Sequence, residues 1–213
     1  MFQRDIFINT VLSAMEKDKD IYFLSADFGA PALDKLRQQY PNNFIHCGIS
    51  EQAMIDVATG LALEGKKIFA YAMAPFISLR AMEQAKCGPG LMDLPICLLS
   101  VGVGLGYADA GPTHYANEDY SCARAVVGTT VYTAADAQTT EQIASELILF
   151  PKFAYVRLDR DDLPDIGELT RTDMNAGYRV IGEPASNKVG LISHGFMLHR
   201  CVAIQNAHPD KFY

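Results

Sequence analysis

Short runs of apolar residues, each about as long as a β-strand, alternate along this chain with stretches of helical periodicity. Nearly every position in these runs is apolar, rather than every second position. Strands of that kind are buried on both faces, as in a parallel sheet covered by helices. The sequence therefore predicts an α/β fold with three layers, in which a mostly parallel sheet has helices on both faces. The predicted strands are 21–25, 67–71, 95–102, 129–133 and 153–158.

The stretches between these runs have the spacing of amphipathic helices. Phe7, Val11 and Met15 form one stripe of the first helix. Gly65 suits the C-terminal end of the second helix, because glycine readily adopts the left-handed conformation there. The predicted helices are 3–17, 51–65, 77–87 and about 139–149.

Composition excludes several classes of protein. Of the 213 residues, 49% are hydrophobic and 20% charged, which allows a sizeable core. The net charge of −7 argues against binding to nucleic acid, whose phosphates require clustered Lys and Arg. No uncharged apolar run is long enough to span a bilayer, and Arg4 and Asp5 stand where a signal peptide needs an apolar core. We expect a soluble, cytoplasmic protein without a membrane partner.

Cysteine and histidine spacings give no support for a metal site on this chain. The five cysteines include no CxxC pair, and an odd number suits free thiols in a reducing compartment. The histidines form no HExxH motif, and His194 and His199 do not share a helical face. We therefore expect no metal-ligating residues here.

The last part of the chain differs from the rest. Residues 166–187 are charged, contain Pro and Gly, and have little periodicity, which predicts a linker. Residues 188–213 follow as a predicted strand at 189–193, a glycine turn and a helix. This unit is too small to bury its own apolar faces. Either it joins the main sheet, or the sequence ends inside a second domain, which is the interpretation we favour.

Glu51 stands between a predicted turn at Gly48 and an apolar helix. The simpler interpretation is an acid in the first helical turn, favoured by the helix dipole. The alternative is a functional carboxyl group held among the apolar neighbours Ile49 and Met54, where it could share a proton with a heterocycle nitrogen. Spacing alone does not decide between the two.

Several motifs together resemble the pyrimidine-binding domain of transketolases and deoxyxylulose-phosphate synthases, which use thiamine diphosphate. The resemblance includes GISEQAMIDVATGLALEGKKIFAYAMAPFISLRAMEQAK (48–86), GPTH (111–114) followed by NEDY (117–120), CARAVVGTTVYTAADAQTTEQ (122–142), and the SADFGAP loop (25–31). Order and spacing are preserved from about residue 5 to about residue 165. The resemblance implies a pyrimidine-binding domain with the thiamine-diphosphate-binding fold over 1–165, and a truncated start of a C-terminal transketolase-like domain over 188–213.

For the cofactor, the resemblance implies that Glu51 hydrogen-bonds N1′ of the aminopyrimidine and assists formation of the carbanion equivalent that adds to a ketone. Phe76 would stack on the pyrimidine ring. Ile49, Gln52 and Met73 would complete the cofactor-binding set. From the residues alone, Phe76 is equally well explained as a core residue and Gln52 as a packing residue.

For the substrate, the resemblance implies that His114 is a catalytic residue, which donates to the ketone oxygen or transfers its proton. It also implies substrate contacts from Asp27, Arg80 and Arg160. Arg80 is also explained as a solvated helix charge. Arg160 stands in the place of a phosphate-binding arginine, but neighbouring aspartates make an ion pair an equally good explanation.

Two departures from the family pattern matter. Transketolases have an acidic residue directly before GPTH, whereas this chain has Ala110 there and Asp109 one position earlier, so pentose-phosphate specificity is in question. The G-D-G and Asn-Asn motif that binds diphosphate and Mg²⁺ is also missing. The resemblance therefore implies an N-terminal diphosphate-binding transketolase subunit as partner, in a homodimer or heterotetramer, with Mg²⁺ held mainly by that subunit.

The predicted function is that of a C-terminal subunit or fragment of a transketolase-like enzyme. It would transfer a two-carbon ketol unit from a ketose donor, expected to be a phosphate, to an aldose acceptor. The alternatives are a deoxyxylulose-phosphate synthase fragment, a 2-oxoacid dehydrogenase beta chain, and a non-catalytic relative. GPTH favours a transketolase or a synthase over a dehydrogenase beta chain. The retained Glu51, Phe76 and His114 argue against a non-catalytic protein. The sequence does not name the sugars.

Overall fold

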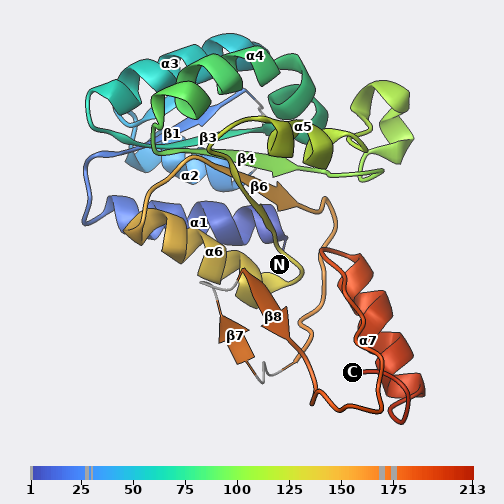
Figure 1. Ribbon diagram of the computed structural model, residues 1–213. Coiled ribbons are helices and arrows are strands. Elements are labelled where there is room, and N and C mark those ends of the chain that lie inside the picture. The colour runs from blue at the N-terminus through green and yellow to red at the C-terminus, as the bar shows by residue number, and fades with distance from the viewer. Residues whose placement is uncertain (1, 27–28, 30, 168–170, 174–176) are drawn as a thin grey trace.

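A six-stranded, entirely parallel sheet forms the centre of the molecule (Figure 1). The computed structural model describes residues 2–26, 29, 31–167, 171–173 and 177–213. The strand order is β2-β1-β3-β4-β6-β5. This arrangement confirms the predicted α/β fold. The strands are β1 (Ile21–Ser25), β2 (Phe44–His46), β3 (Lys67–Met73), β4 (Ile96–Val101), β5 (Thr130–Thr133) and β6 (Ala154–Leu158).

Helices cover both faces of the sheet (Figure 1). One face is covered by α1 (Gln3–Met15), α2 (Pro31–Gln39) and α6 (Ala137–Leu149). The other is covered by α3 (Glu51–Leu63), α4 (Met82–Ala85) and α5 (Asp119–Ala125). The predicted three layers are therefore present. In the described part of the chain, no helix is long and apolar enough to cross a membrane.

Two hydrophobic cores lie on opposite faces of the sheet, and neighbouring residues of one strand belong to different cores. In β3, Phe69 and Tyr71 face α1 and α2, whereas Ile68 and Ala70 face α3 and α4. Because side chains alternate between the two faces of a strand, a sheet buried on both sides requires apolar residues at successive positions. This explains the uninterrupted apolar runs.

The predicted helix at 77–87 is present only in pieces. The chain forms a π-helical turn at Phe76–Arg80, the short helix α4, and a second π-helical turn at Lys86–Gly90. Pro89 lies in the second turn, where it has no N–H to continue the helical hydrogen bonds. Single π-helical turns often occur at functional sites, and the first one carries two of the predicted site residues.

The region after residue 165 is built differently from the sheet. A two-stranded antiparallel sheet, β7 (Arg171–Asp173) and β8 (Tyr178–Val180), is followed by helix α7 (Met197–Ala207). The predicted strand at 189–193 is wrong, because Val189 forms only an isolated bridge with Phe212. Around this bridge, the backbone N–H groups of Val189 and Leu191 donate to the carbonyl oxygens of Lys211 and Tyr213.

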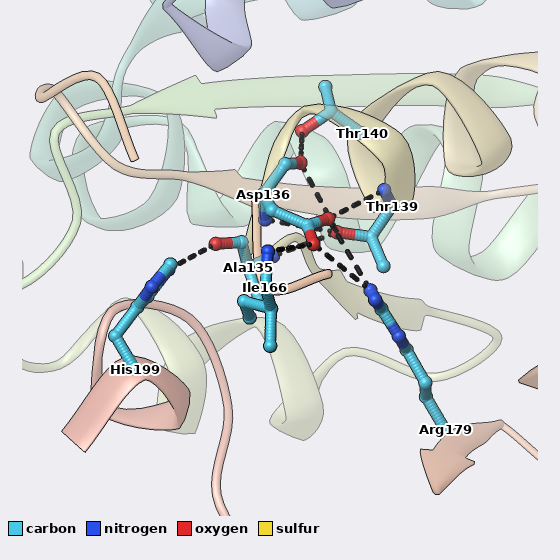
Figure 2. A network of polar contacts seen from close by, with 7 residues as sticks. All are labelled: Ala135, Asp136, Thr139, Thr140, Ile166, Arg179 and His199. Atoms are coloured by element: carbon cyan, nitrogen blue, oxygen red, sulfur yellow. Dashed lines mark hydrogen bonds and ion pairs between the residues drawn. The ribbon is translucent and has the colours of Figure 1, made fainter. Parts of the chain in front are cut away.

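Asp136 connects this region to the sheet (Figure 2). Its carboxylate caps α6 by accepting from the Thr139 backbone N–H at 2.8 Å, and Arg179 from β8 donates to the same carboxylate at 3.3 Å. Next to it, the His199 Nε2 of α7 lies 2.8 Å from the carbonyl oxygen of Ala135. β8 and α7 are therefore held against the main sheet just after the end of β5.

Candidate active site at the carboxyl edge of the sheet

Four loops at the carboxyl ends of the strands carry most of the predicted site residues. All six strands are parallel, so these loops meet at one edge, where ligands bind in open α/β sheets. The loop after β2 leads into α3, the loop after β3 into the first π-helical turn, and β4 continues into a glycine-rich loop. The segment after β6 carries Arg160.

Glu51 is the first residue of α3, and its side chain is only 2% exposed. Gly48, in the turn before it, has a φ of 70°, a conformation that glycine adopts without strain. Arg80 Nη1 donates to Glu51 Oε2 at 2.7 Å. A buried carboxylate needs such a partner. Arg80 is therefore more than a solvated helix charge.

Phe76 lies between Arg80 and His114. The guanidinium carbon of Arg80 is 4.2 Å from the centre of the Phe76 ring, within range of a cation–π interaction. The His114 ring meets Phe76 edge-on, with the ring centres 5.2 Å apart. Phe76 is only half-buried, and among the described residues it belongs to neither hydrophobic core. Phe76 therefore contacts two other predicted site residues instead of packing in a core.

His114 ends a short 3₁₀ turn, Pro112–His114, in the loop after β4. Its Nδ1 is 2.9 Å from the Thr113 hydroxyl, and its ring centre is 6.5 Å from that of Tyr107. Tyr107 lies across Gly102, where a Cβ atom would collide with the Tyr107 ring. Gly102 is therefore needed for the loop to fold over the sheet edge.

Arg160 pairs with Asp109, which lies 51 positions earlier in the chain. Its Nη1 donates to Asp109 Oδ1 at 2.5 Å and to the Gly106 carbonyl oxygen at 3.2 Å, and its Nη2 lies 3.3 Å from Asp109 Oδ2. The guanidinium carbon is 4.6 Å from the centre of the Tyr107 ring. The hydrogen bond from Arg160 lowers the pKa of Asp109. The sequence allowed an ion pair for Arg160, but not this partner.

The remaining predicted residues are less engaged. Ile49 is 75% exposed, Gln52 is exposed, and Met73 is half-buried at the end of β3. Asp27 lies outside the described residues. The structure thus joins Glu51, Arg80, Phe76, His114, Tyr107 and Arg160 in one row of contacts, which we call the edge row.

A buried ion pair between α5 and β6 was not predicted from the sequence. Arg157 donates to the two oxygens of Asp119, from Nε at 2.7 Å and from Nη2 at 3.0 Å, and the Tyr155 hydroxyl donates to the same carboxylate at 3.2 Å. Burial raises the pKa of Tyr155. In the sequence, the feature that could have indicated this pair is an arginine inside the otherwise apolar run 153–158. The pair joins β6 to the first residue of α5, the helix that follows the loop carrying His114.

The edge row fits the pyrimidine end of a thiamine cofactor. It offers a buried carboxyl group for a ring nitrogen and an aromatic face for stacking, on loops two strands apart. Both groups contact Arg80 in this structure. Within the described residues, no three His, Cys, Asp or Glu side chains gather in a way that could hold a metal ion.

The parallel sheet and its carboxyl-edge site define an α/β domain of the thiamine-diphosphate-binding class. Comparison with known families makes the assignment specific: the family described as "Transketolase, pyrimidine binding domain" matches residues 3–165. The chain belongs to this family.

Several similar proteins are named as subunits of transketolases. The chain is 32% identical over 166 residues to an apulose-4-phosphate transketolase subunit of Phocaeicola vulgatus, covering 78% of this chain and 53% of the relative. It is 30% identical to a 6-deoxy-6-sulfo-D-fructose transketolase subunit of a Clostridium species, covering 74% of this chain and 49% of the relative. The chain thus spans about half the length of these relatives.

Solved structures show the same fold. A split-gene transketolase, described as an inactive beta4 tetramer, superimposes with a TM-score of 0.80 at 22% identity, covering all of this chain and 69% of that one. The transketolase of Campylobacter jejuni gives a TM-score of 0.81 at 20% identity, covering 96% of this chain and 34% of that one.

Proposed function

We propose that this chain is the pyrimidine-binding, C-terminal subunit or fragment of a thiamine-diphosphate-dependent transketolase-like enzyme. It transfers a two-carbon ketol unit from a ketose donor to an aldose acceptor. The observation that carries this proposal is the edge row, which contains the buried Glu51, the ring of Phe76 and His114. These residues lie in a domain of the transketolase family.

In this proposal, Glu51 holds a proton at N1′ of the pyrimidine. Its position at the start of α3 and its burial fix the direction of that hydrogen bond. Phe76 provides the face on which the ring stacks. When bound, the cofactor supplies a carbanion equivalent that attacks the ketone carbon.

His114 acts on the sugar. Thr113 engages its Nδ1, so Nε2 is the nitrogen that meets a substrate oxygen and donates or accepts a proton there. The edge-on contact with Phe76 keeps the imidazole beside the pyrimidine face rather than under it. Cofactor binding and proton transfer to or from the sugar are thus assigned to different side chains.

A diphosphate-binding partner subunit completes the proposed site and supplies most of the contacts to Mg²⁺. Support comes from the names of two relatives, which are transketolase subunits, and from the share of their length that this chain spans. These names also favour a transketolase over a synthase or a dehydrogenase beta chain. We further propose a cytoplasmic location, supported by five cysteines that are all free in the structure.

The test is reconstitution with an N-terminal transketolase subunit encoded beside this gene. We expect the purified pair, loaded with thiamine diphosphate and Mg²⁺, to shorten a ketose by two carbons and lengthen an aldose by two. Each subunit alone should be inactive. A pair that binds the cofactor but transfers no two-carbon unit from any of a panel of ketoses would overturn the proposal.

A further inference from the structure

The end of the edge row farthest from Glu51 is formed by Arg160. Tyr107 connects it to His114, with the two ring centres 6.5 Å apart and the Arg160 guanidinium carbon 4.6 Å from the Tyr107 ring centre. In the proposed enzyme, where His114 meets the reacting end of the sugar, a sugar that extends along the edge row has its other end at Arg160. The charge at this end then acts on that part of the sugar.

Asp109 already occupies the hydrogen-bonding fork of Arg160. Each carboxylate oxygen contacts a different guanidinium nitrogen, at 2.5 and 3.3 Å, and the Gly106 carbonyl oxygen takes a further contact with Nη1 at 3.2 Å. Arginine recognises a phosphate through the same two-pronged geometry. A phosphate at this point would have to displace Asp109 or share the guanidinium with it.

The loop holds Asp109 in place. It lies in the 3₁₀ turn Ala108–Ala110, closed by backbone hydrogen bonds from Ala110 N to Tyr107 O at 3.0 Å and from Gly111 N to Ala108 O at 3.2 Å. Asp161 and Asp162 follow Arg160 directly in the chain and are exposed. A phosphate monoester carries nearly two negative charges at neutral pH. At this point it would meet a single cation, Arg160, which is already paired with Asp109 and is followed by two further acids.

We propose that Asp109 is a specificity-determining residue, which pairs with Arg160 and selects sugars whose end distal to the reacting carbon is a neutral hydroxyl terminus rather than a phosphate. The inference rests on the proposed function and specifies its substrate class. It differs from the phosphate donor predicted from the sequence. It also separates this chain from the two relatives whose names specify a phosphorylated and a sulfonated sugar.

The first experiment uses the chain alone and inorganic phosphate as the probe. The side-chain Nε–Hε NMR signal of Arg160, assigned with the Arg160→Met variant, is followed during titration. We expect no saturable shift in the wild type up to about 50 mM phosphate, and saturable binding at least about tenfold tighter in Asp109→Asn. Asn keeps the size of the side chain and removes its charge.

Asp161→Asn is the matched control, because it removes the same charge from an exposed residue next to Arg160. It should change the phosphate titration by less than about twofold. Wild-type binding as tight as that of Asp109→Asn, or an equal gain in both variants, would overturn the inference. Neither result depends on transferase activity, so this arm does not test the proposed function.

The second experiment uses the reconstituted pair and compares kcat/KM for an unphosphorylated aldose with that for its terminal phosphate ester. We expect the wild type to prefer the unphosphorylated sugar, and Asp109→Asn to shift the ratio toward the ester by about tenfold or more. Two-carbon transfer with an unmoved ratio would overturn the inference and leave the proposed function standing.

Discussion

Arg80 and Glu51 form an ion pair between the turn after β3 and the start of α3, with Arg80 Nη1 2.7 Å from Glu51 Oε2. Glu51 is 2% exposed and Arg80 is 40% exposed, so the pair connects a buried acid to the solvent. Arg80 also lies over Phe76. A pyrimidine that uses both the acid and the ring must therefore move Arg80 from at least one of them.

The Arg80→Met variant tests the strength of this pair. We expect it to lower the free energy of unfolding by about 1–2 kcal/mol, because it leaves a buried carboxylate without its charged partner, although the exposure of Arg80 reduces the effect. In a Glu51→Gln background the loss should fall below about 0.5 kcal/mol. Urea unfolding of the wild type, the two single variants and the double variant measures both values.

Arg124, which lies over Tyr120 on α5, provides the control. Arg124→Met should lower the free energy of unfolding by less than about 0.5 kcal/mol.

The Glu51→Gln variant tests the proposed proton at N1′. Gln is nearly isosteric and can still form a hydrogen bond, so the stability of the protein should change by only about 1 kcal/mol. It cannot supply the proton, so in the reconstituted enzyme the exchange of the cofactor C2 proton into D₂O should slow by several powers of ten. NMR of the bound cofactor follows this exchange. A rate within about threefold of the wild type would reduce Glu51 to a helix-start acid.

His114→Ala should separate catalysis from cofactor binding. We expect turnover of a ketose donor to fall by roughly 10²–10⁴, the usual effect of removing an acid–base group, with cofactor affinity nearly unchanged. Steady-state kinetics and cofactor titration of the reconstituted enzyme provide the two values. Equal losses in both would instead assign His114 to the cofactor pocket. Thr113→Val is the control for the loop, since it keeps the size of the side chain and removes only the contact to Nδ1.

The chain without its partner should bind thiamine diphosphate weakly, with a dissociation constant above about 0.1 mM in the presence of Mg²⁺. The reason is that the charged diphosphate and its metal provide the strongest contacts, and the edge row offers a fit only for the pyrimidine end. Isothermal calorimetry measures the constant. Micromolar affinity of this chain alone would contradict the two-subunit proposal.

Asp136 should make the stability of the protein depend on pH in the acid range. Its burial would raise the pKa, but the hydrogen bonds from Thr139 and the charge of Arg179 outweigh that effect and lower it. A lowered pKa contributes stability above the unfolded-state value of about 3.9, and this contribution is lost as the pH falls through the lower folded-state value. Urea unfolding at several pH values between about 7 and about 2.5 measures how the free energy of unfolding changes with pH.

Asp136→Asn keeps a good helix cap and removes the titrating group, so its acid slope should be flatter than that of the wild type. Glu141→Gln, an exposed change on the same helix, should keep the wild-type slope. Equal acid slopes in Asp136→Asn and the wild type would contradict the role assigned to Asp136.

Strands and local motifs were predictable because their information is local. The predicted strand 21–25 has the bounds of β1, since apolar residues at successive positions are required wherever a sheet is buried on both faces. Glu51 and His114 were singled out as candidate site residues from motifs a few residues long, and the structure brings them into the same row of contacts. Helix α2 was missed, because only Ala32, Leu33 and Leu36 are buried in a charged stretch.

Contacts between distant segments were not predictable in this way. The partner of Arg160 depends on how the loop after β4 folds over the sheet, which places Asp109 across 51 positions of chain. Likewise, the contact of Arg80 with Glu51 depends on a π-helical turn that the sequence suggested as a regular helix. The strand predicted at 189–193 was wrong because, among its residues, only Val189 forms a bridge, and its partner Phe212 could not be identified from the apolar run itself.

The strand order has a consequence for how such a protein can change over evolutionary time. Glu51 and Phe76 follow β2 and β3, whereas Asp109, His114 and Arg160 follow β4 and β6. In the proposed enzyme, Glu51 and Phe76 serve the cofactor while Asp109, His114 and Arg160 serve the sugar, so the two sets are encoded in separate stretches of the gene. Substitutions in the later loops would then exchange one sugar for another while Glu51 and Phe76 stay intact, and new substrates would be accessible by small genetic steps.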